Sequence, residues 1–238
     1  MTTDYNEIAE EFSGRVDRMP GNRLYERPAT IALLPPLKGI DVLDAGCGSG
    51  FYTEYAYKAG ARVVAFDPSQ GMVEQALARL GTTSCEIYCC RSSELRSVLG
   101  DRKFDLVLSN LVMHYVQDLE TEFRYLADVL KPDGKIVVSM KHPLIHIAYI
   151  RQFGYRSVGL VQQKWEWVKG TIHHVQRPMG AITSAIYDAG LSIERLVEAE
   201  PVPEMEKVDP AGYAFAKRIP FFIHFVLTHR CNATGAPQ

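Results

Sequence analysis

From Ile40 onward, apolar residues form short runs of strand length, separated by segments in which apolar positions recur at helical spacing. Strands that alternate with helices of about ten residues favour right-handed crossovers between parallel strands. We therefore expect an α/β fold with a mainly parallel, doubly wound sheet and helices on both faces. The predicted strands are 41–45, 62–66, 85–90, 104–110 and 135–140, and the predicted helices are 51–59, 72–80 and 119–130.

The segments that flank this alternating core have different patterns. Tyr5, Ile8 and Phe12 recur at helical spacing and predict a helical N-terminal region, in which a second helix covers 28–34. Residues 143–178 interrupt the alternation, and a helix at 178–189 and strands at 191–198 and 220–229 follow. We expect one domain over 1–238, composed of an N-terminal helical region (1–37), a core (38–142), an insertion (143–178), a last helix with two strands (179–230) and a tail (231–238).

The composition is that of an ordinary globular chain, with 47% hydrophobic and 23% charged residues. Lys and Arg number 26 and Asp and Glu 28, so the formal net charge of −2 argues against nucleic acid as a partner. The N-terminus has no basic segment followed by an apolar run, and the longest apolar stretches are far shorter than the ~20 residues of a membrane helix. These features predict a cytoplasmic protein that binds no membrane.

Five cysteines without the spacing of a disulfide framework predict free thiols. Three of them lie in or beside one predicted strand, with no histidine nearby, so we expect no metal site there.

The loop after the first strand, Gly46-Cys47-Gly48-Ser49-Gly50, opens a helix, which is the context in which glycines let a backbone approach a ligand closely. Asp67 ends the second strand, where an acid can accept both hydroxyl hydrogens of a ribose. The third glycine comes one residue early for a dinucleotide loop. Asp44, two residues before the loop, would repel a pyrophosphate but attract an ammonium or sulfonium group.

These segments resemble the motifs of class I S-adenosylmethionine-dependent methyltransferases. Residues 42–50 are similar to the first motif and residues 64–72 to the second. Residues 104–116 resemble the fourth motif, and residues 130–135 look like the turn before the fifth strand. The resemblance implies a Rossmann-like sheet of seven strands, in which Phe221–Leu227 forms an antiparallel seventh strand between the fifth and the sixth.

The resemblance also implies S-adenosylmethionine as cofactor, S-adenosylhomocysteine as product, and no metal. In such enzymes the acid of the first motif lies near the ligand's amino group, the second acid binds the ribose, and the residue after the fourth strand faces the methionyl end. An acid usually follows the third strand and meets the adenine, but Arg91-Ser92-Ser93 stands there instead. The residues expected to bind the cofactor are Asp44, Gly46, Gly48, Asp67, Pro68, Ser69, Met72, Ser92, Ser93, Asn110, Leu111 and Tyr5.

Methyl transfer from a sulfonium needs alignment more than acid–base chemistry, although a hydroxyl acceptor benefits from a base. His114 and His142 follow the fourth and fifth strands and are the candidate catalytic bases. Their alternative roles are packing behind the cofactor for His114 and a hydrogen bond at a strand end for His142.

The insertion at 143–178 is the expected substrate cap, and the N-terminal helices are the expected lid. Aromatic residues of the cap, with two histidines and an arginine, would surround a small, planar or aromatic acceptor. Trp165 and Trp167 could instead alternate on an ordinary strand. The residues expected to bind the acceptor are Tyr25, Trp165, Trp167, His173, His174 and Arg177, with Tyr149, Phe153 and Tyr155 in the same wall.

The function that the sequence favours is methyl transfer to oxygen or nitrogen of a small molecule, of the kind found in bacterial secondary metabolism. The motif of base-nitrogen methyltransferases is absent, since Ser109-Asn110-Leu111-Val112 stands in its place. Two other functions stay open: a non-catalytic nucleoside-binding module and a nicotinamide-dependent oxidoreductase. The expected oligomeric state is a monomer or a homodimer.

Overall fold

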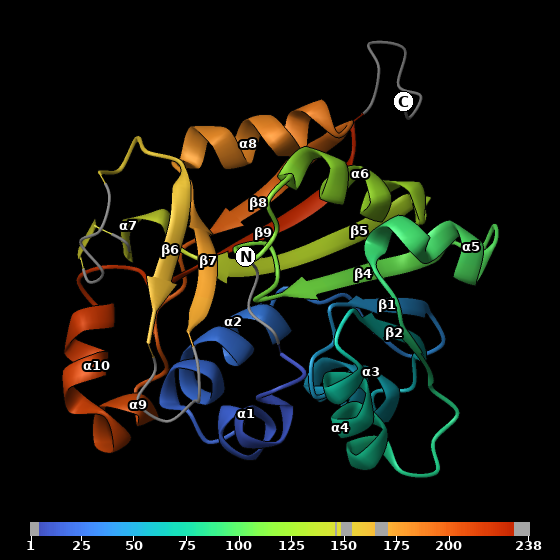
Figure 1. The fold of residues 1–238 in the computed structure, drawn as a ribbon, viewed down its shortest axis with the longest axis horizontal. Coiled ribbons are helices and arrows are strands. Elements are labelled where there is room, and N and C mark those ends of the chain that lie inside the picture. The colour runs from blue at the N-terminus through green and yellow to red at the C-terminus, as the bar shows by residue number, and fades with distance from the viewer. Residues whose placement is uncertain (1–4, 146, 149–153, 165–170, 231–238) are drawn as a thin grey trace.

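The computed structural model describes residues 5–145, 147–148, 154–164 and 171–230, and its centre is a sheet of seven strands (Figure 1). The strands occur in the order β3-β2-β1-β4-β5-β9-β8, so the chain reverses its direction of winding between β1 and β4. Ligands of open α/β sheets bind at such a switch point. The strands are β1 (Asp41–Ala45), β2 (Arg62–Asp67), β3 (Glu86–Cys89), β4 (Phe104–Asn110), β5 (Leu130–Lys141), β8 (Leu191–Val197) and β9 (Phe222–His229).

The pairing directions confirm the predicted Rossmann-like sheet. β1, β2, β3, β4 and β5 pair in parallel, whereas β9 is antiparallel both to β5 and to β8. Ile136 lies opposite Leu227, and Val138 lies opposite Phe225, so the antiparallel strand lies between the fifth and the last parallel strand as expected. Consequently, the carboxyl ends of the five N-terminal strands meet along one edge.

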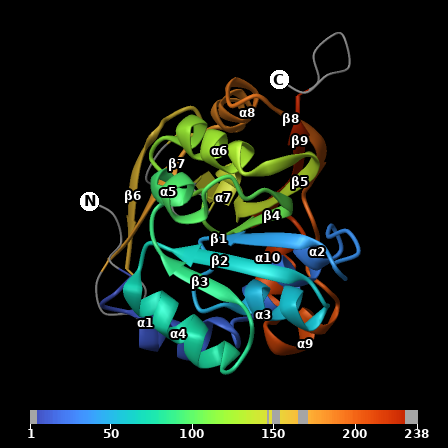
Figure 2. The same cartoon turned by 90° about the vertical axis from the view of Figure 1, so that its right-hand side faces the viewer.

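Helices pack on both faces of this sheet (Figure 2). On one face, Phe123, Leu126 and Ile182 of α6 and α8 join β4 and β5 residues such as Val107 and Val138 in one buried cluster. On the other face, residues of α3 pack against β1, β4 and β5, and α4 contacts β2 and β3. The helices on the two faces are α3 (Phe51–Lys58), α4 (Gln70–Leu80), α5 (Leu95–Leu99), α6 (Leu119–Asp128) and α8 (Met179–Asp188).

Local side-chain chemistry sets several boundaries within one or two residues of the prediction. Ser69 caps α4, because its hydroxyl accepts a hydrogen bond from the Met72 amide at 3.2 Å. Asp118 caps α6 in the same way, through the Thr121 amide at 3.1 Å.

β5 begins earlier than the predicted residue 135, because Leu130 already pairs with Phe104 before a register shift in the ladder.

The N-terminal region is helical, but its elements are shifted from the predicted ones. α1 spans Ala9–Val16, and a π-helical turn, η1 (Asn22–Glu26), runs directly into α2 (Arg27–Ile31). α2 begins before the predicted Pro28, since a proline is tolerated in the first turn of a helix. α1 packs against α4 (Figure 2), and Asp17 after α1 forms ion pairs with Arg79 and, at 2.6 Å, with Arg27.

The insertion forms a separate layer beside the main sheet. It begins with α7 (Pro143–Ile145), and β6 (Gly159–Gln163) pairs with β7 (Ile172–Gln176) as an antiparallel hairpin (Figure 1). Two short helices that the apolar pattern did not predict, α9 (Glu204–Val208) and α10 (Pro210–Ala216), lie between β8 and β9 in the chain. Within the residues described, no helix has the length and apolar character needed to cross a membrane.

Candidate active site

Three strands bring polar residues to the same edge of the sheet. Asp44 lies at the end of β1, Asp67 ends β2, and Asn110 ends β4. The parallel registers align these ends, since Ala45 pairs with Phe66 and Asp44 pairs with Leu108. The two carboxyl groups and the amide therefore lie around the switch point in the strand order.

The glycine loop packs closely against its neighbours. Gly46, Gly48 and Gly50 have φ angles of +75°, +52° and +82°, a region that side chains disfavour. A Cβ on Gly46 would lie 2.5 Å from Cγ2 of Val112 in the loop after β4. The amides of Gly46 and Cys47 both donate to the Phe66 carbonyl, at 2.9 and 3.0 Å. Only glycine at position 46 allows this approach between the two loops.

The Asp67 carboxyl is held by two backbone amides. Gly48 donates to Oδ2 and Ser69 donates to Oδ1, each at 2.9 Å. Burial nevertheless raises the pKa of Asp67 above its ordinary value. Each oxygen keeps a further lone pair. A ligand with two adjacent hydroxyl groups therefore fits this fixed carboxyl.

Asp44 is almost completely buried, and its Oδ2 accepts a hydrogen bond of 2.6 Å from the hydroxyl of Thr53 in α3. Burial, assisted by the negative charge of nearby Asp67, raises the pKa of Asp44 to about 7. Among the described residues, no lysine or arginine pairs with it. A ligand cation beside Asp44 would stabilise its ionised form.

The Asn110 side chain is buried, yet neither its oxygen nor its nitrogen has a hydrogen-bond partner among the described residues. Leaving a buried amide unpaired costs roughly 1–3 kcal/mol. Leu111, the next residue, has a φ of +56°, and its amide donates to the Ser139 carbonyl at 2.8 Å. The positive φ of Leu111 marks a turn directly after the unpaired Asn110 amide.

Glu26 is a buried residue that the sequence patterns did not single out. Its carboxyl accepts hydrogen bonds from Ser139 at 2.5 Å, from Tyr52 at 2.8 Å and from Thr30 at 2.8 Å. The Ser139 hydroxyl in turn accepts from the Leu111 amide at 3.2 Å. One carboxyl thus joins the N-terminal region, α3, β5 and the turn after β4.

The first described residues lie across this edge. The side-chain oxygen Oδ1 of Asn6 accepts from the Ser69 hydroxyl and from the Gly71 amide, both at 3.0 Å. Tyr5 donates to the Tyr115 hydroxyl at 2.6 Å. Burial, Tyr115 and then the charge of Asp67 raise the pKa of Tyr5. The contacts of Asn6 with Ser69 and Gly71 were not predicted, and the cofactor role of Tyr5 stays a prediction.

The two candidate bases have different surroundings. Both ring nitrogens of buried His142 are engaged, because Nδ1 accepts from the Leu144 amide at 3.0 Å and Nε2 lies 2.7 Å from Glu198 Oε1. Nε2 then carries the proton and donates to Glu198. This geometry favours the alternative role of His142 as a structural residue at the strand end. His114 is also buried, with its ring 4.2 Å from that of Tyr115.

The remaining predicted cofactor residues lie in the segments that follow β2 and β3. Met72 is buried in α4, and Pro68 is exposed beside Asp67. Ser92 begins the short helix η2 (Ser92–Glu94) and donates a hydrogen bond to Glu122 of α6, whereas Ser93 is exposed.

The predicted acceptor residues do not form one surface in the described part of the chain. Tyr25 is 1% exposed, its hydroxyl accepts from the Phe221 amide at 3.2 Å, and its ring packs against Phe222. It is a core residue, which argues against direct acceptor contact. Arg177 donates to the carbonyls of Val116 and Gln117 and so holds the loop after β4.

The cap hairpin brings His174 close to the site. The His174 ring lies 6.1 Å from that of His114, and His174 is fully buried whereas His173 is partly exposed. Tyr155 joins the hairpin to α8, because its backbone carbonyl accepts from the Gln176 side chain at 3.5 Å and its hydroxyl accepts from the Met179 amide at 3.1 Å. Trp165, Trp167, Tyr149 and Phe153 lie outside the described residues, so their predicted roles stay predictions.

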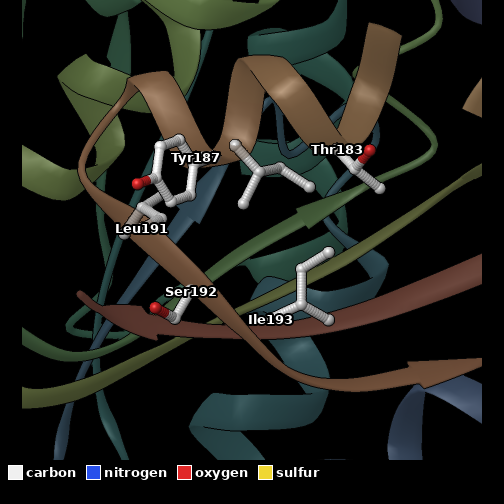
Figure 3. Close-up of a pocket in the computed structure, with 6 residues that line it drawn as sticks. Thr183, Tyr187, Leu191, Ser192 and Ile193 are labelled. Carbon is white, nitrogen blue, oxygen red and sulfur yellow. The ribbon is translucent and has the colours of Figure 1, made fainter. Parts of the chain in front are cut away.

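A surface depression of about 300 Å³ lies elsewhere, between α8 and β8 (Figure 3). Thr183 and Tyr187 line one side and Leu191, Ser192 and Ile193 the other. It contains none of the predicted site residues. No cluster of histidine, cysteine and acidic residues suited to a metal occurs in the part of the chain that is described.

Comparison with protein families gives one match across the core. Residues 43–138 match a family model described as a methyltransferase domain. An uncharacterised protein of Haemophilus influenzae is 28% identical over 200 residues, which cover 74% of this chain and 77% of that protein. A ubiquinone biosynthesis O-methyltransferase of Bradyrhizobium diazoefficiens is 35% identical over 49% of this chain and 45% of its own length.

A malonyl-[acyl-carrier protein] O-methyltransferase of Acetivibrio thermocellus is 32% identical over 46% of this chain and 40% of its own length. The chain thus matches less than half the length of these two named relatives. Among solved structures, an S-adenosylmethionine-dependent methyltransferase from Mesorhizobium loti has a TM-score of 0.71 and 25% identity, over 89% of this chain and 99% of that one. The protein of the structure described as the DhpI-SAM-HEP complex has a TM-score of 0.67 and 18% identity, over 94% of this chain and 93% of that one.

Replacing Glu26 with glutamine tests the buried carboxyl network. Because burial raises the pKa of Glu26, the folded state holds this proton more tightly than the unfolded state. Its contribution is therefore present below the ordinary glutamate pKa of about 4.3 and is lost as pH rises toward the folded-state pKa. Urea unfolding at several pH values should show the wild type losing free energy of unfolding, relative to Glu26→Gln, as pH rises from 4 to 7. A difference in free energy of unfolding between the two proteins that stays constant with pH would contradict a raised pKa of Glu26.

Proposed function

We propose that the chain, whose residues 43–138 match a methyltransferase domain, is a class I S-adenosylmethionine-dependent methyltransferase that methylates an oxygen or nitrogen atom of a small molecule. The observation that carries this proposal is the edge formed by Asp44, the glycine loop and Asp67. One carboxyl there is fixed for a pair of hydroxyls, and another lies buried without a cation among the described residues. S-adenosylmethionine supplies both a ribose and an ammonium group.

We assign the ribose to Asp67. The amides of Gly48 and Ser69 hold its carboxyl in place before a ligand arrives, so little orientation is lost on binding. Gly48, where an added Cβ would meet no atom within 4 Å, leaves room for the cofactor beside the loop, whereas Gly46 allows the close approach of Val112. Met72 would pack against the base. Pro68, Ser69 and Tyr5 complete this side of the proposed pocket.

The methionyl end of the cofactor is assigned to Asp44, Asn110 and Leu111. The ammonium group would lie beside Asp44, whose charge is otherwise disfavoured by burial. The unpaired side-chain amide of Asn110 would offer the methionyl end one acceptor and one donor group, and the backbone carbonyl of Asn110 would offer a second acceptor. A dinucleotide would instead bring a pyrophosphate toward buried Asp44, which disfavours the oxidoreductase alternative.

The bound cofactor supplies a methyl group that is already activated by its sulfonium. The protein then has to align the acceptor and exclude water. Tyr5 and Asn6 contact Tyr115, Ser69 and Gly71. Tyr5 also packs in one cluster with Ile172 of the cap hairpin, whose His174 lies beside His114. His114 is the remaining candidate to take a proton from a hydroxyl acceptor, because both nitrogens of His142 are engaged.

Oxygen is the favoured acceptor atom. The two named relatives are described as O-methyltransferases, one of ubiquinone biosynthesis and one of malonyl-[acyl-carrier protein]. The proposed test measures S-adenosylhomocysteine formation from S-adenosylmethionine with phenols, carboxylic acids and amines as separate acceptor sets. Turnover with an oxygen acceptor supports the proposal, and a lack of turnover with every set contradicts it.

Asp67→Ala should weaken S-adenosylhomocysteine binding by more than tenfold, since a hydrogen bond to a charged group is worth about 1.5–3 kcal/mol. Asp101→Ala, which removes an exposed carboxylate between α5 and β4, is the matched control. Dissociation constants from calorimetry provide the measurement. Equal affinities for the wild type and Asp67→Ala would refute the ribose assignment.

Cofactor binding should also depend on pH through Asp44. With a pKa of about 7 in the free protein, Asp44 must lose its proton to hold an ammonium group. The affinity for S-adenosylhomocysteine should therefore fall as pH drops below 7, approaching about tenfold for each pH unit. Asp44→Asn should remove most of this dependence and bind more weakly at pH 8. A wild-type affinity that is flat from pH 8 to pH 5.5 would exclude this role.

A further inference from the structure

Glu122 is a half-buried carboxyl on α6 that the proposed cofactor assignment does not use. Its partner is the hydroxyl of Ser92, which donates to Oε1, and no lysine or arginine among the described residues pairs with it. Burial raises the pKa of Glu122 despite this hydrogen bond. A carboxyl that is largely removed from water without a cation is costly, so its position calls for another donor.

The place of Glu122 is defined by the strand next to Asp67. β3 lies directly beside β2, and the Cys90 amide donates to the Asp67 carbonyl at 3.2 Å. Ser92 follows two residues later, at the start of η2, and contacts between η2 and α6 bring Glu122 to it. Cys90 belongs to the same buried cluster as Phe123, the neighbour of Glu122 on α6. Glu122 therefore lies one strand beyond the carboxyl assigned to the ribose.

The order of polar groups along this edge matches the order of groups in the cofactor. Asp44 on β1 is assigned to the amino end and Asp67 on β2 to the ribose, so the base should lie toward the end of β3. The residues after β3, Arg91-Ser92-Ser93, contain no acid. α6 brings one there instead.

We propose that Glu122 is the acid that accepts a hydrogen bond from the exocyclic amino group of the adenine, with Ser92 orienting its carboxyl. The inference rests on the proposed cofactor site and adds to it a residue that selects adenine. Ser92 occupies one carboxylate oxygen, and the other oxygen has no partner in the described part of the chain, so it can accept from an N–H donor. A base with a carbonyl oxygen at the same position would instead place that oxygen against the carboxylate. Both oxygens are hydrogen-bond acceptors, and neither has a hydrogen to donate.

The experiment compares S-adenosylhomocysteine with S-inosylhomocysteine, which has a carbonyl oxygen in place of the amino group and a hydrogen on the neighbouring ring nitrogen N1. Calorimetry on the wild-type protein should give a preference of about tenfold or more for the adenine ligand, since the wrong base leaves a buried acceptor unpaired. Glu122→Gln should reduce that preference at least about tenfold, because an amide can donate to the carbonyl oxygen as well as accept.

Two variants separate recognition of the base from a merely structural tie between α6 and η2. Glu120→Gln, on the same helix and paired with Arg124, should leave the preference unchanged. Ser92→Ala should lower it partly, because the carboxyl keeps its charge but loses its orienting donor. An unaltered preference in Glu122→Gln, with S-adenosylhomocysteine still bound, would overturn the role of Glu122 and leave the proposed function intact. A wild type that does not bind S-adenosylhomocysteine would overturn both.

A pH series on the wild type tests the same inference without a variant, in case Glu122→Gln does not fold. Asp44 and Asp67 face the parts that both ligands share, so their protonation cancels in the ratio of the two dissociation constants. Protonated Glu122 can donate to the carbonyl oxygen of the inosine ligand. The preference for the adenine ligand should therefore fall as pH drops from 8 to 5. A ratio that is constant over this range would contradict the proposal.

Discussion

The two backbone amides that hold the Asp67 carboxyl are the interaction on which the candidate site depends. Gly48 can donate to Asp67 only because the glycine loop turns back toward β2, with the Gly46 and Cys47 amides on the Phe66 carbonyl. That turn requires positive φ angles and the close approach of Gly46 to Val112. The loop after β1, the end of β2 and the loop after β4 are therefore fixed relative to one another, and the proposed ribose, amino and adenine positions follow from this arrangement.

The N-terminal region is part of the site through two sets of contacts. Glu26 carries hydrogen bonds from Tyr52 and Ser139, and it thereby links α3, which also holds Asp44 through Thr53, to the turn that presents Asn110. Asn6 binds Ser69 and Gly71, and Tyr5 binds Tyr115. The N-terminal region therefore contacts the segment that follows β2 as well as α3 and β5.

Sequence reasoning predicted what is encoded locally. β1, β4 and the starts of α4 and α6 follow from apolar runs and capping residues, and the positions of Asp44 and Asp67 follow from strand ends. It failed where a role is set by contacts between distant segments. Glu26 and Glu122 are ordinary helical glutamates in the sequence, and only packing buries them beside Ser139 and Ser92. His142 was a candidate base and Tyr25 a candidate acceptor-binding residue, yet Glu198, Leu144 and Phe221 engage their polar atoms.

The central claim is that this edge of the sheet binds an adenosyl ligand with a ribose and an amino-acid end. The most direct measurement is calorimetric titration of the purified protein with S-adenosylmethionine, S-adenosylhomocysteine and NADH in parallel. The account predicts one site per chain for the first two ligands, at micromolar concentration, and no heat of binding for NADH. Binding of NADH alone would contradict it, because the buried Asp44 carboxyl beside the glycine loop would then have to tolerate a pyrophosphate.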